Sequence, residues 1–162
     1  MRIDDELYKL AVALGGAAVA RGVRIATAES CTGGLVAGAI TAVAGSSDWF
    51  DCGFVTYSNE AKIGQLAVPP GTIEQFGAVS EETALSMAEG ALRASRAQWA
   101  VAVTGIAGPA GGTPDKPVGT VCFAWVGPGA AKAYRTCLGG DRVGIRRESV
   151  RIALQGVLDR LA

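Results

Sequence analysis

The chain has 162 residues, of which 49% are hydrophobic and 19% are charged, and its 15 basic residues balance 15 acidic ones. This length suits one domain over residues 1–162 with a buried apolar core, and the composition excludes a disordered chain. The zero net charge argues against a protein whose main task is binding nucleic acid, because phosphate binding needs a surplus of Lys and Arg.

The chain contains no histidine. A Ser-His-Asp triad, a Cys-His pair and a histidine-ligated metal are therefore excluded. Acyl chemistry at neutral pH would need Lys, a carboxylate, Tyr or water as its base. The cysteines are widely spaced and form no C-x-x-C pair, so we expect neither a zinc site nor a secreted disulfide scaffold. They are Cys31, Cys52, Cys122 and Cys137.

The N-terminal sequence is acidic and lacks the apolar segment of a signal peptide. Polar or charged residues interrupt every apolar stretch before it reaches the roughly 18 residues of a membrane span. We therefore expect a cytoplasmic protein with no membrane partner.

Apolar residues at helical spacing predict helices, and β-branched apolar runs predict strands. Pro69, Pro70 and Gly71 are expected to end one of these helices, and the short link over 127–129 predicts an antiparallel hairpin. In chain order the predicted elements are helix 4–20, strand 23–28, helix 35–43, strand 53–57, helices 60–66 and 81–96, strands 99–104, 118–126 and 133–138, and helix 142–161.

This order predicts an α/β fold, a single-domain three-layer α/β/α sandwich with a mixed, mainly parallel sheet. Ligands in such folds bind at the carboxyl ends of the strands. Three loops leave those ends, over residues 27–34, 57–62 and 104–117. If their strands are neighbours, the three loops converge on one site.

The first loop places Ser30 between a strand and a helix that opens with Gly33 and Gly34. A serine there faces a cleft beside free backbone N–H groups, as in a nucleophile elbow, although the G-x-S-x-G sequence is absent. Ser30 is therefore either a nucleophile beside an oxyanion hole or a helix N-cap. Cys31 is either a rival nucleophile or a small buried apolar residue.

The second loop leads to Lys62, about one turn into a helix, and Tyr57 ends the strand before it. A lysine near a helix N-terminus lies at the unfavourable end of the helix dipole, which favours the neutral amine that a general base needs. Ser-Lys pairs are one solution to base catalysis without histidine. Lys62 is thus either the base for Ser30 or a solvated helix lysine.

The third loop, over residues 105–117, is rich in glycine and proline and follows the strand that ends at Thr104. A loop of this length inside a compact domain is usually functional. It lacks the P-loop and G-x-G-x-x-G sequences, so it either wraps a small ligand with its backbone amides or forms a flexible turn.

Arg142 begins the last helix, again at the unfavourable end of the dipole. Its guanidinium and the helix N-terminus together would suit a phosphate. Arg146, Arg147 and Arg151 on the same helix are interpreted as surface or interface charges.

The aromatic residues are expected in the core or in an interface. Either Trp49 or Phe50 is also a candidate to stack on a flat ring near the site.

Seven ordered motifs resemble the CinA C-terminal domain family, and the match covers nearly the whole chain, from about residue 5 to residue 160. They are A-E-S-C-T-G-G (28–34), G-S-S (45–47), V-T-Y-S-N (55–59) with Lys62, G-A-V-S (77–80), T-G-I-A-G-P (104–109), K-P-V-G-T-V (116–121) and G-D-R (140–142). Because the seven motifs occur together, the resemblance is far more specific than any single loop.

The resemblance implies an α/β/α amidohydrolase that uses no metal and no cofactor and forms a homo-oligomer. The family includes stand-alone nicotinamide-nucleotide amidases, so the implied partner is a small-molecule nucleotide substrate. The implied reaction converts nicotinamide mononucleotide to nicotinic acid mononucleotide and ammonia, a step of pyridine nucleotide recycling.

Carried over by motif, Ser30 matches the family's nucleophile, Lys62 its base and Tyr57 the tyrosine beside them, which would orient Lys62 or relay a proton. Arg142 is expected near the substrate phosphate. Backbone amides over 30–34 are assigned to the oxyanion. The residues expected to bind substrate are Thr32, Gly33, Gly34, Asn59, Thr104, Gly105 and Arg142.

Two other functions remain open from the sequence. One is a non-catalytic regulatory module of the same fold that binds a pyridine nucleotide. The other is an amidase for a different small amide. Saturable binding without ammonia release would identify the first, and a substrate screen would identify the second.

Overall fold

A computed structural model describes residues 3–162 and places five strands in one sheet with the order β2-β1-β3-β4-β5. β1 pairs in parallel with β2 and β3, whereas β4 is antiparallel to both β3 and β5. β4 therefore runs against the other strands, and the mixed, mainly parallel sheet predicted from the sequence is confirmed. The strands are β1 (Ile25–Glu29), β2 (Phe50–Val55), β3 (Trp99–Gly105), β4 (Thr120–Gly127) and β5 (Ala130–Cys137).

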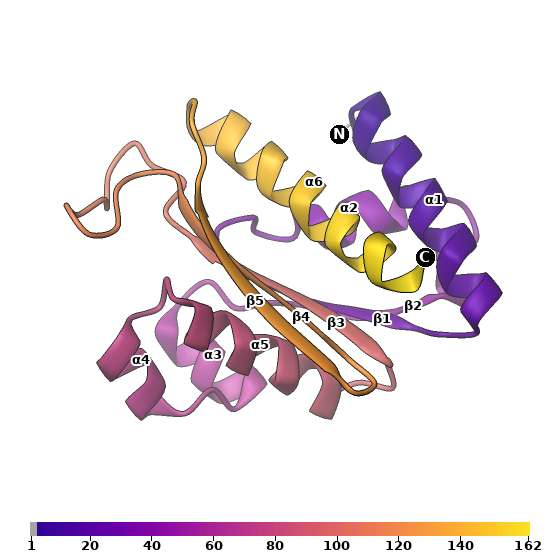
Figure 1. The fold of residues 1–162 in the computed structure, drawn as a ribbon, viewed down its shortest axis with the longest axis horizontal. Coiled ribbons are helices and arrows are strands. Elements are labelled where there is room, and N and C mark those ends of the chain that lie inside the picture. Colours follow the sequence, from indigo (N-terminus) through magenta and orange to yellow (C-terminus); the bar gives the residue numbers. More distant parts are fainter. Residues whose placement is uncertain (1–2) are drawn as a thin grey trace.

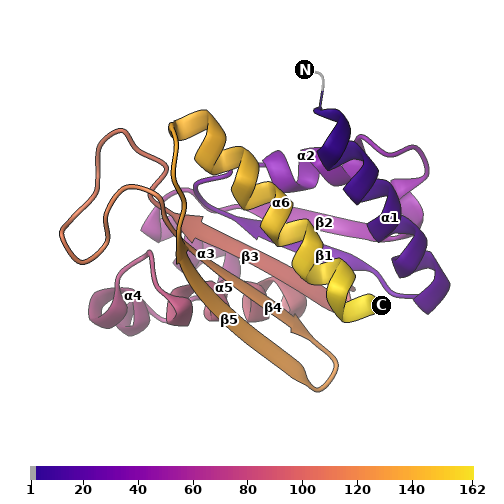
Figure 2. The same cartoon turned by 45° about the horizontal axis from the view of Figure 1, so that its top comes forward.

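Helices cover both faces of the sheet and complete the three predicted layers (Figure 1). Figure 2 shows α6 crossing the sheet diagonally with α1 beside it. Among residues 3–162, no helix is long and apolar enough to cross a membrane. One face carries α1 (Asp5–Arg21), α2 (Leu35–Thr41) and α6 (Arg142–Leu161), the other carries α3 (Asn59–Leu66), α4 (Pro70–Phe76) and α5 (Glu81–Arg93), and a short 3-10 helix, η1 (Ser46–Asp48), precedes β2.

The two faces of the sheet are packed differently. Beneath α6 the side chains are large, and Phe123 and Trp125 are at most 5% exposed. Small side chains on the opposite face let α5 lie close to the sheet. At Gly90, α5 also meets the end of α3, since a Cβ there would lie 2.0 Å from the carbonyl oxygen of Leu66. The small residues are Ala26, Ala28, Ala100, Ala102 and Ala124.

The structure differs from the sequence prediction in one helix and in several boundaries. Pro70, expected only to end a helix, is the first residue of α4. Proline is favourable at that position because the first N–H of a helix needs no intrahelical partner. β2 and β5 both begin three residues earlier than predicted, at Phe50 and Ala130, because pairing with β1 and β4 extends them.

The carboxyl ends of β1, β2 and β3 lie at one edge of the sheet. β1 and β3 are neighbours, but the chain leaves β1 towards β2 and leaves β3 towards β4. Connections that diverge in this way open a crevice beyond the strand ends. The three loops predicted to converge all begin at this crevice.

Candidate active site

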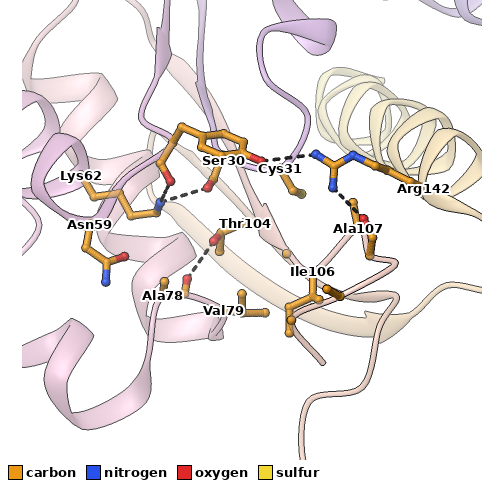
Figure 3. A pocket seen from close by; sticks show the side chains of 15 residues that line it. Ser30, Cys31, Asn59, Lys62, Ala78, Val79, Thr104, Ile106, Ala107 and Arg142 are labelled. Carbon is orange, nitrogen blue, oxygen red and sulfur yellow. Dashed lines mark hydrogen bonds between the residues drawn. The ribbon is translucent and has the colours of Figure 1, made fainter. Parts of the chain in front are cut away.

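Ser30 follows β1 directly and opens the turn over residues 30–34, here called the Ser30 turn. The Ser30 N–H donates to the carbonyl oxygen of Val103 in β3 at 2.9 Å, and the Ser30 carbonyl accepts from Gly33 N at 3.0 Å. These bonds fix the backbone on both sides of a side chain that is only 8% exposed. Its hydroxyl faces Lys62 (Figure 3).

The first turn of α3 brings Lys62 to Ser30. Ser58 caps this helix by accepting a backbone N–H with its hydroxyl at 3.0 Å. The Lys62 side chain is 1% exposed. Its Nζ lies 3.0 Å from Ser30 Oγ, and it donates to the carbonyl oxygens of Thr56 at 2.8 Å and Tyr57 at 3.4 Å. Lys62 is therefore a buried residue directed at Ser30 and not a solvated one.

The three contacts of Lys62 Nζ suit an amine that can lose its proton. A neutral amine has two N–H donors and one lone pair. The two donors match the carbonyl oxygens of Thr56 and Tyr57, which only accept, and the lone pair is left for the Ser30 hydroxyl. Burial lowers the pKa of Lys62 from its ordinary value of 10.5. Within the described residues, Lys62 takes part in no ion pair that would hold the proton in place.

Cys31 lies beside Ser30, but its thiol hydrogen-bonds to no basic side chain in the part of the chain that the structure describes. Its side chain is 6% exposed, and burial raises the pKa of its thiol to about 12. The thiol is therefore protonated at neutral pH, whereas a nucleophilic cysteine needs the thiolate. Sγ packs against Gly105, where a Cβ would lie 3.1 Å away. This environment favours the small buried residue over the rival nucleophile.

A cavity of about 290 Å³ opens in front of Ser30 and Lys62. The loops after β1, β2 and β3 and the start of α6 all contribute to it (Figure 3). Seven of the ten site residues named from the sequence line this cavity, namely Ser30, Tyr57, Asn59, Lys62, Thr104, Gly105 and Arg142.

Thr104 and Gly105 shape the side of the cavity at the end of β3. The Thr104 hydroxyl donates to the carbonyl oxygen of Ala78 at 2.8 Å, which ties β3 to the segment between α4 and α5. Gly105 permits a close approach, since a Cβ there would lie 2.9 Å from the carbonyl oxygen of Thr120. Asn59 is exposed at the first residue of α3 and lines the cavity with its side chain.

Tyr57 and Arg142 meet across the mouth of the cavity. Arg142 Nη2 lies 3.3 Å from the Tyr57 hydroxyl, and its Nη1 donates to the carbonyl oxygen of Gly108 at 2.7 Å. Tyr57 is 62% exposed, and only its backbone carbonyl contacts Lys62. The Tyr57 carbonyl thus contacts Lys62, whereas the Tyr57 hydroxyl lies beside Arg142 and hydrogen-bonds to neither Ser30 nor Lys62 among the described residues.

Thr32, Gly33 and Gly34 do not line the cavity. Thr32 is fully buried. The Gly34 N–H is taken by the carboxylate of Glu29, which also accepts from two N–H groups of α2, at 2.9 Å and 3.0 Å. The sequence analysis missed this buried carboxylate, although the favourable site for an anion at a helix N-terminus was a signal for it. The N-terminus of α2 is therefore occupied from within the protein.

Two amides of the Ser30 turn are not taken by another residue. Among residues 3–162, the backbone N–H groups of Cys31 and Thr32 donate to no other residue. Of the amides over 30–34 assigned to the oxyanion, those of Ser30, Gly33 and Gly34 are already used within the protein. At the start of α6 the Asp141 carboxylate accepts from Gly144 N, so one amide of the anion site expected at that helix is already used.

An apolar wall faces the polar groups of the cavity (Figure 3). The wall consists of Ala78, Val79, Ile106 and Ala107. The motifs G-A-V-S and T-G-I-A-G-P contain these residues, but the sequence analysis gave their side chains no role.

Trp49 and Phe50 were proposed from the sequence as partners that stack on a flat ring. Trp49 precedes β2 and Phe50 begins it, so both lie at the opposite end of that strand from the site. Trp49 packs instead against Gly15 in the core.

In the described part of the chain, no group of three or more His, Cys, Asp or Glu side chains is placed to hold a metal ion. The polar side chains that line the cavity are those of Ser30, Cys31, Tyr57, Asn59, Lys62, Thr104 and Arg142.

The model of the CinA C-terminal domain matches residues 7–161. The chain is 53% identical over 153 residues to the nicotinamide-nucleotide amidohydrolase PncC of Escherichia coli (strain K12), covering 94% of this chain and 93% of that protein. It is also 52% identical to a putative competence-damage inducible protein of Symbiobacterium thermophilum, covering 96% of this chain but 40% of that longer protein.

The fold of the chain also matches that of a solved relative. The crystal structure of the competence/damage inducible protein CihA from Agrobacterium tumefaciens superposes with a TM-score of 0.95 at 47% identity, covering 99% of this chain and 98% of that one. Sequence and structure agree, and this chain belongs to the CinA C-terminal domain family.

Proposed function

We propose that this protein is a nicotinamide-nucleotide amidase, a hydrolase that converts nicotinamide mononucleotide and water to nicotinic acid mononucleotide and ammonia. The observation that carries the proposal is the 3.0 Å contact between Ser30 Oγ and the buried Lys62 Nζ at the cavity. The names of relatives about half identical to this chain support the substrate class.

The reaction begins with transfer of the Ser30 proton to Lys62 as Oγ attacks the carboxamide carbon. The lone pair of the neutral amine accepts that proton, and the lowered pKa of Lys62 makes the neutral form accessible. Lys62 then gives the proton to the departing nitrogen, so ammonia leaves and an ester of Ser30 remains. Water attacks this ester with Lys62 taking its proton, and Ser30 leaves with a proton returned to its oxygen.

The tetrahedral intermediate needs hydrogen-bond donors for its oxyanion. We assign this role to the N–H groups of Cys31 and Thr32, the two amides of the Ser30 turn that donate to no other described residue. The dipole of α2 contributes little, because the Glu29 carboxylate already occupies its N-terminus.

The rest of the cavity suits a nucleotide with a flat base. The apolar wall would pack against the pyridine ring and leave the carboxamide at Ser30. Arg142 lies at the mouth with two of its five N–H donors used by Gly108 and Tyr57. Its remaining donors and its charge would hold the phosphate.

The test is ammonia release from a panel of nicotinamide compounds. We expect turnover of nicotinamide mononucleotide and little or none of free nicotinamide, which lacks the phosphate for Arg142. Turnover of a different carboxamide with none of the mononucleotide would contradict the substrate assignment. Saturable binding of the mononucleotide with no ammonia release would favour the non-catalytic module.

A further inference from the structure

Arg146, interpreted from the sequence as a surface or interface charge, contacts the Ser30 turn from outside the cavity. It lies on α6, one helical turn after Arg142. Its Nε donates to the carbonyl oxygen of Cys31 at 3.0 Å, and its Nη2 donates to that of Thr32 at 3.3 Å. One guanidinium thus spans two successive carbonyls of the turn that carries the nucleophile.

A hydrogen bond that fixes a backbone carbonyl also fixes the direction of the N–H group in the same peptide unit. Each peptide unit is planar and trans, so its C=O and N–H point in opposite directions. The Cys31 carbonyl shares its peptide with the Thr32 N–H, which is free among the described residues. A cation at the carbonyl oxygen also polarises the peptide and makes that N–H a stronger donor. Arg146 therefore acts on an amide that it does not touch.

The turn is built to admit this side chain. Gly33 has a φ of +59°, and a Cβ there would lie 3.2 Å from Arg146 Nη2. From the inner side, the Glu29 carboxylate holds Gly34 and the start of α2. In the described part of the chain, no charged side chain other than Glu29 and Arg146 hydrogen-bonds to the backbone of residues 30–34.

We propose that Arg146 is a positioning residue for the reaction. By holding the Cys31 and Thr32 carbonyls, it fixes the conformation of the Ser30 turn. The inference rests on the proposed function for its kinetic consequence. Without the guanidinium, Ser30 and the oxyanion amides shift relative to Lys62. Arg142 and the apolar wall are untouched, so the loss falls on kcat and leaves KM in place.

The neighbouring Arg147 provides a matched control. It lies on the same helix and carries the same charge, but it pairs with Asp4 and Glu6 away from the Ser30 turn. The experiment compares Arg146→Met and Arg147→Met with the wild type by steady-state kinetics on nicotinamide mononucleotide and by deuterium uptake of peptides covering residues 30–37. Arg146→Lys keeps the charge and the stem but loses the fork that reaches two carbonyls.

Arg146→Met is expected to lower kcat at least about tenfold with KM within about twofold, since small misplacements of reacting groups are costly. Uptake over residues 30–37 rises in this variant, Arg147→Met behaves as the wild type, and Arg146→Lys shows an intermediate kcat. Equal kcat losses in both methionine variants, or wild-type kcat in Arg146→Lys, would overturn the proposal.

Deuterium uptake separates failure of this inference from failure of the proposed function. If the wild type releases no ammonia, the proposed function is wrong, and uptake alone decides the role of Arg146. Faster uptake in Arg146→Met alone supports the positioning of the turn, whereas unchanged uptake overturns it.

Discussion

Ser30 Oγ and Lys62 Nζ lie 3.0 Å apart, although they come from opposite layers of the fold. Ser30 follows β1 on the way to α2, whereas Lys62 belongs to α3 on the other face of the sheet. Their contact depends on β1 and β2 being parallel neighbours, so that the loops after both strands start at the same edge. It also depends on the close packing of α5 against the end of α3 at Gly90.

The pH dependence of the reaction follows from the state of Lys62. The base must be neutral, and burial lowers the pKa of Lys62 from 10.5. We therefore expect kcat/KM to rise with pH through a limb whose pKa lies below 10.5. If kcat/KM stays flat or falls with rising pH over the whole range below 10.5, Lys62 is not the base.

The same lowered pKa makes stability depend on pH. In the unfolded chain Lys62 keeps its ordinary pKa of 10.5, so between the two values the unfolded state binds more protons. The free energy of unfolding of the wild type, taken relative to Lys62→Met, should therefore rise as pH increases through this window. Denaturant unfolding at several pH values measures the difference, and a difference that falls with pH would contradict this reasoning.

Arg142 should distinguish substrates with and without a phosphate. A charge-assisted hydrogen bond is worth about 1.5–3 kcal/mol, so Arg142→Ala should raise the KM for nicotinamide mononucleotide about tenfold or more. The same substitution should barely affect nicotinamide riboside, which has no phosphate. Tyr57→Phe removes only the hydroxyl beside Arg142, so it is the matched control for loss of that contact without loss of the guanidinium. Equal effects of Arg142→Ala on both substrates would place the phosphate elsewhere.

Glu29→Gln should cost more stability than the same acid-to-amide change at a half-buried helix cap. Glu29 is fully buried, and its carboxylate accepts three backbone N–H groups, which a carboxamide cannot do. We expect a loss of about 1–3 kcal/mol. Asp4→Asn, at the half-buried N-cap of α1, keeps a capping oxygen and should cost less than about 1 kcal/mol. Thermal unfolding of the two variants provides the comparison.

The sequence predicted the layers and most of the elements because their signals are local. Ser58, Ser80 and Asp141 cap helices near the predicted starts. α4 was missed because two prolines and a glycine indicate the end of a helix as readily as its beginning.

The convergence of three loops on one cavity was also foreseeable, because parallel strands share one edge. The sequence could not show which hydrogen-bond partners the polar groups around the cavity take. The carboxylate of Glu29 takes the amides of α2, the hydroxyl of Tyr57 is directed at Arg142, and Arg146 contacts the Ser30 turn from 115 residues away. These contacts join elements distant in the chain, and their partners follow from the packing of the layers.

The central claim is that Ser30 attacks and Lys62 carries the proton. Ammonia release from nicotinamide mononucleotide by the wild type, Ser30→Ala and Lys62→Met, each shown to be folded and assayed with a chelator present, tests it most directly. We predict turnover by the wild type and a loss of at least about a thousandfold in both variants, as expected for members of one catalytic unit. Turnover by Ser30→Ala at the wild-type rate would contradict the account.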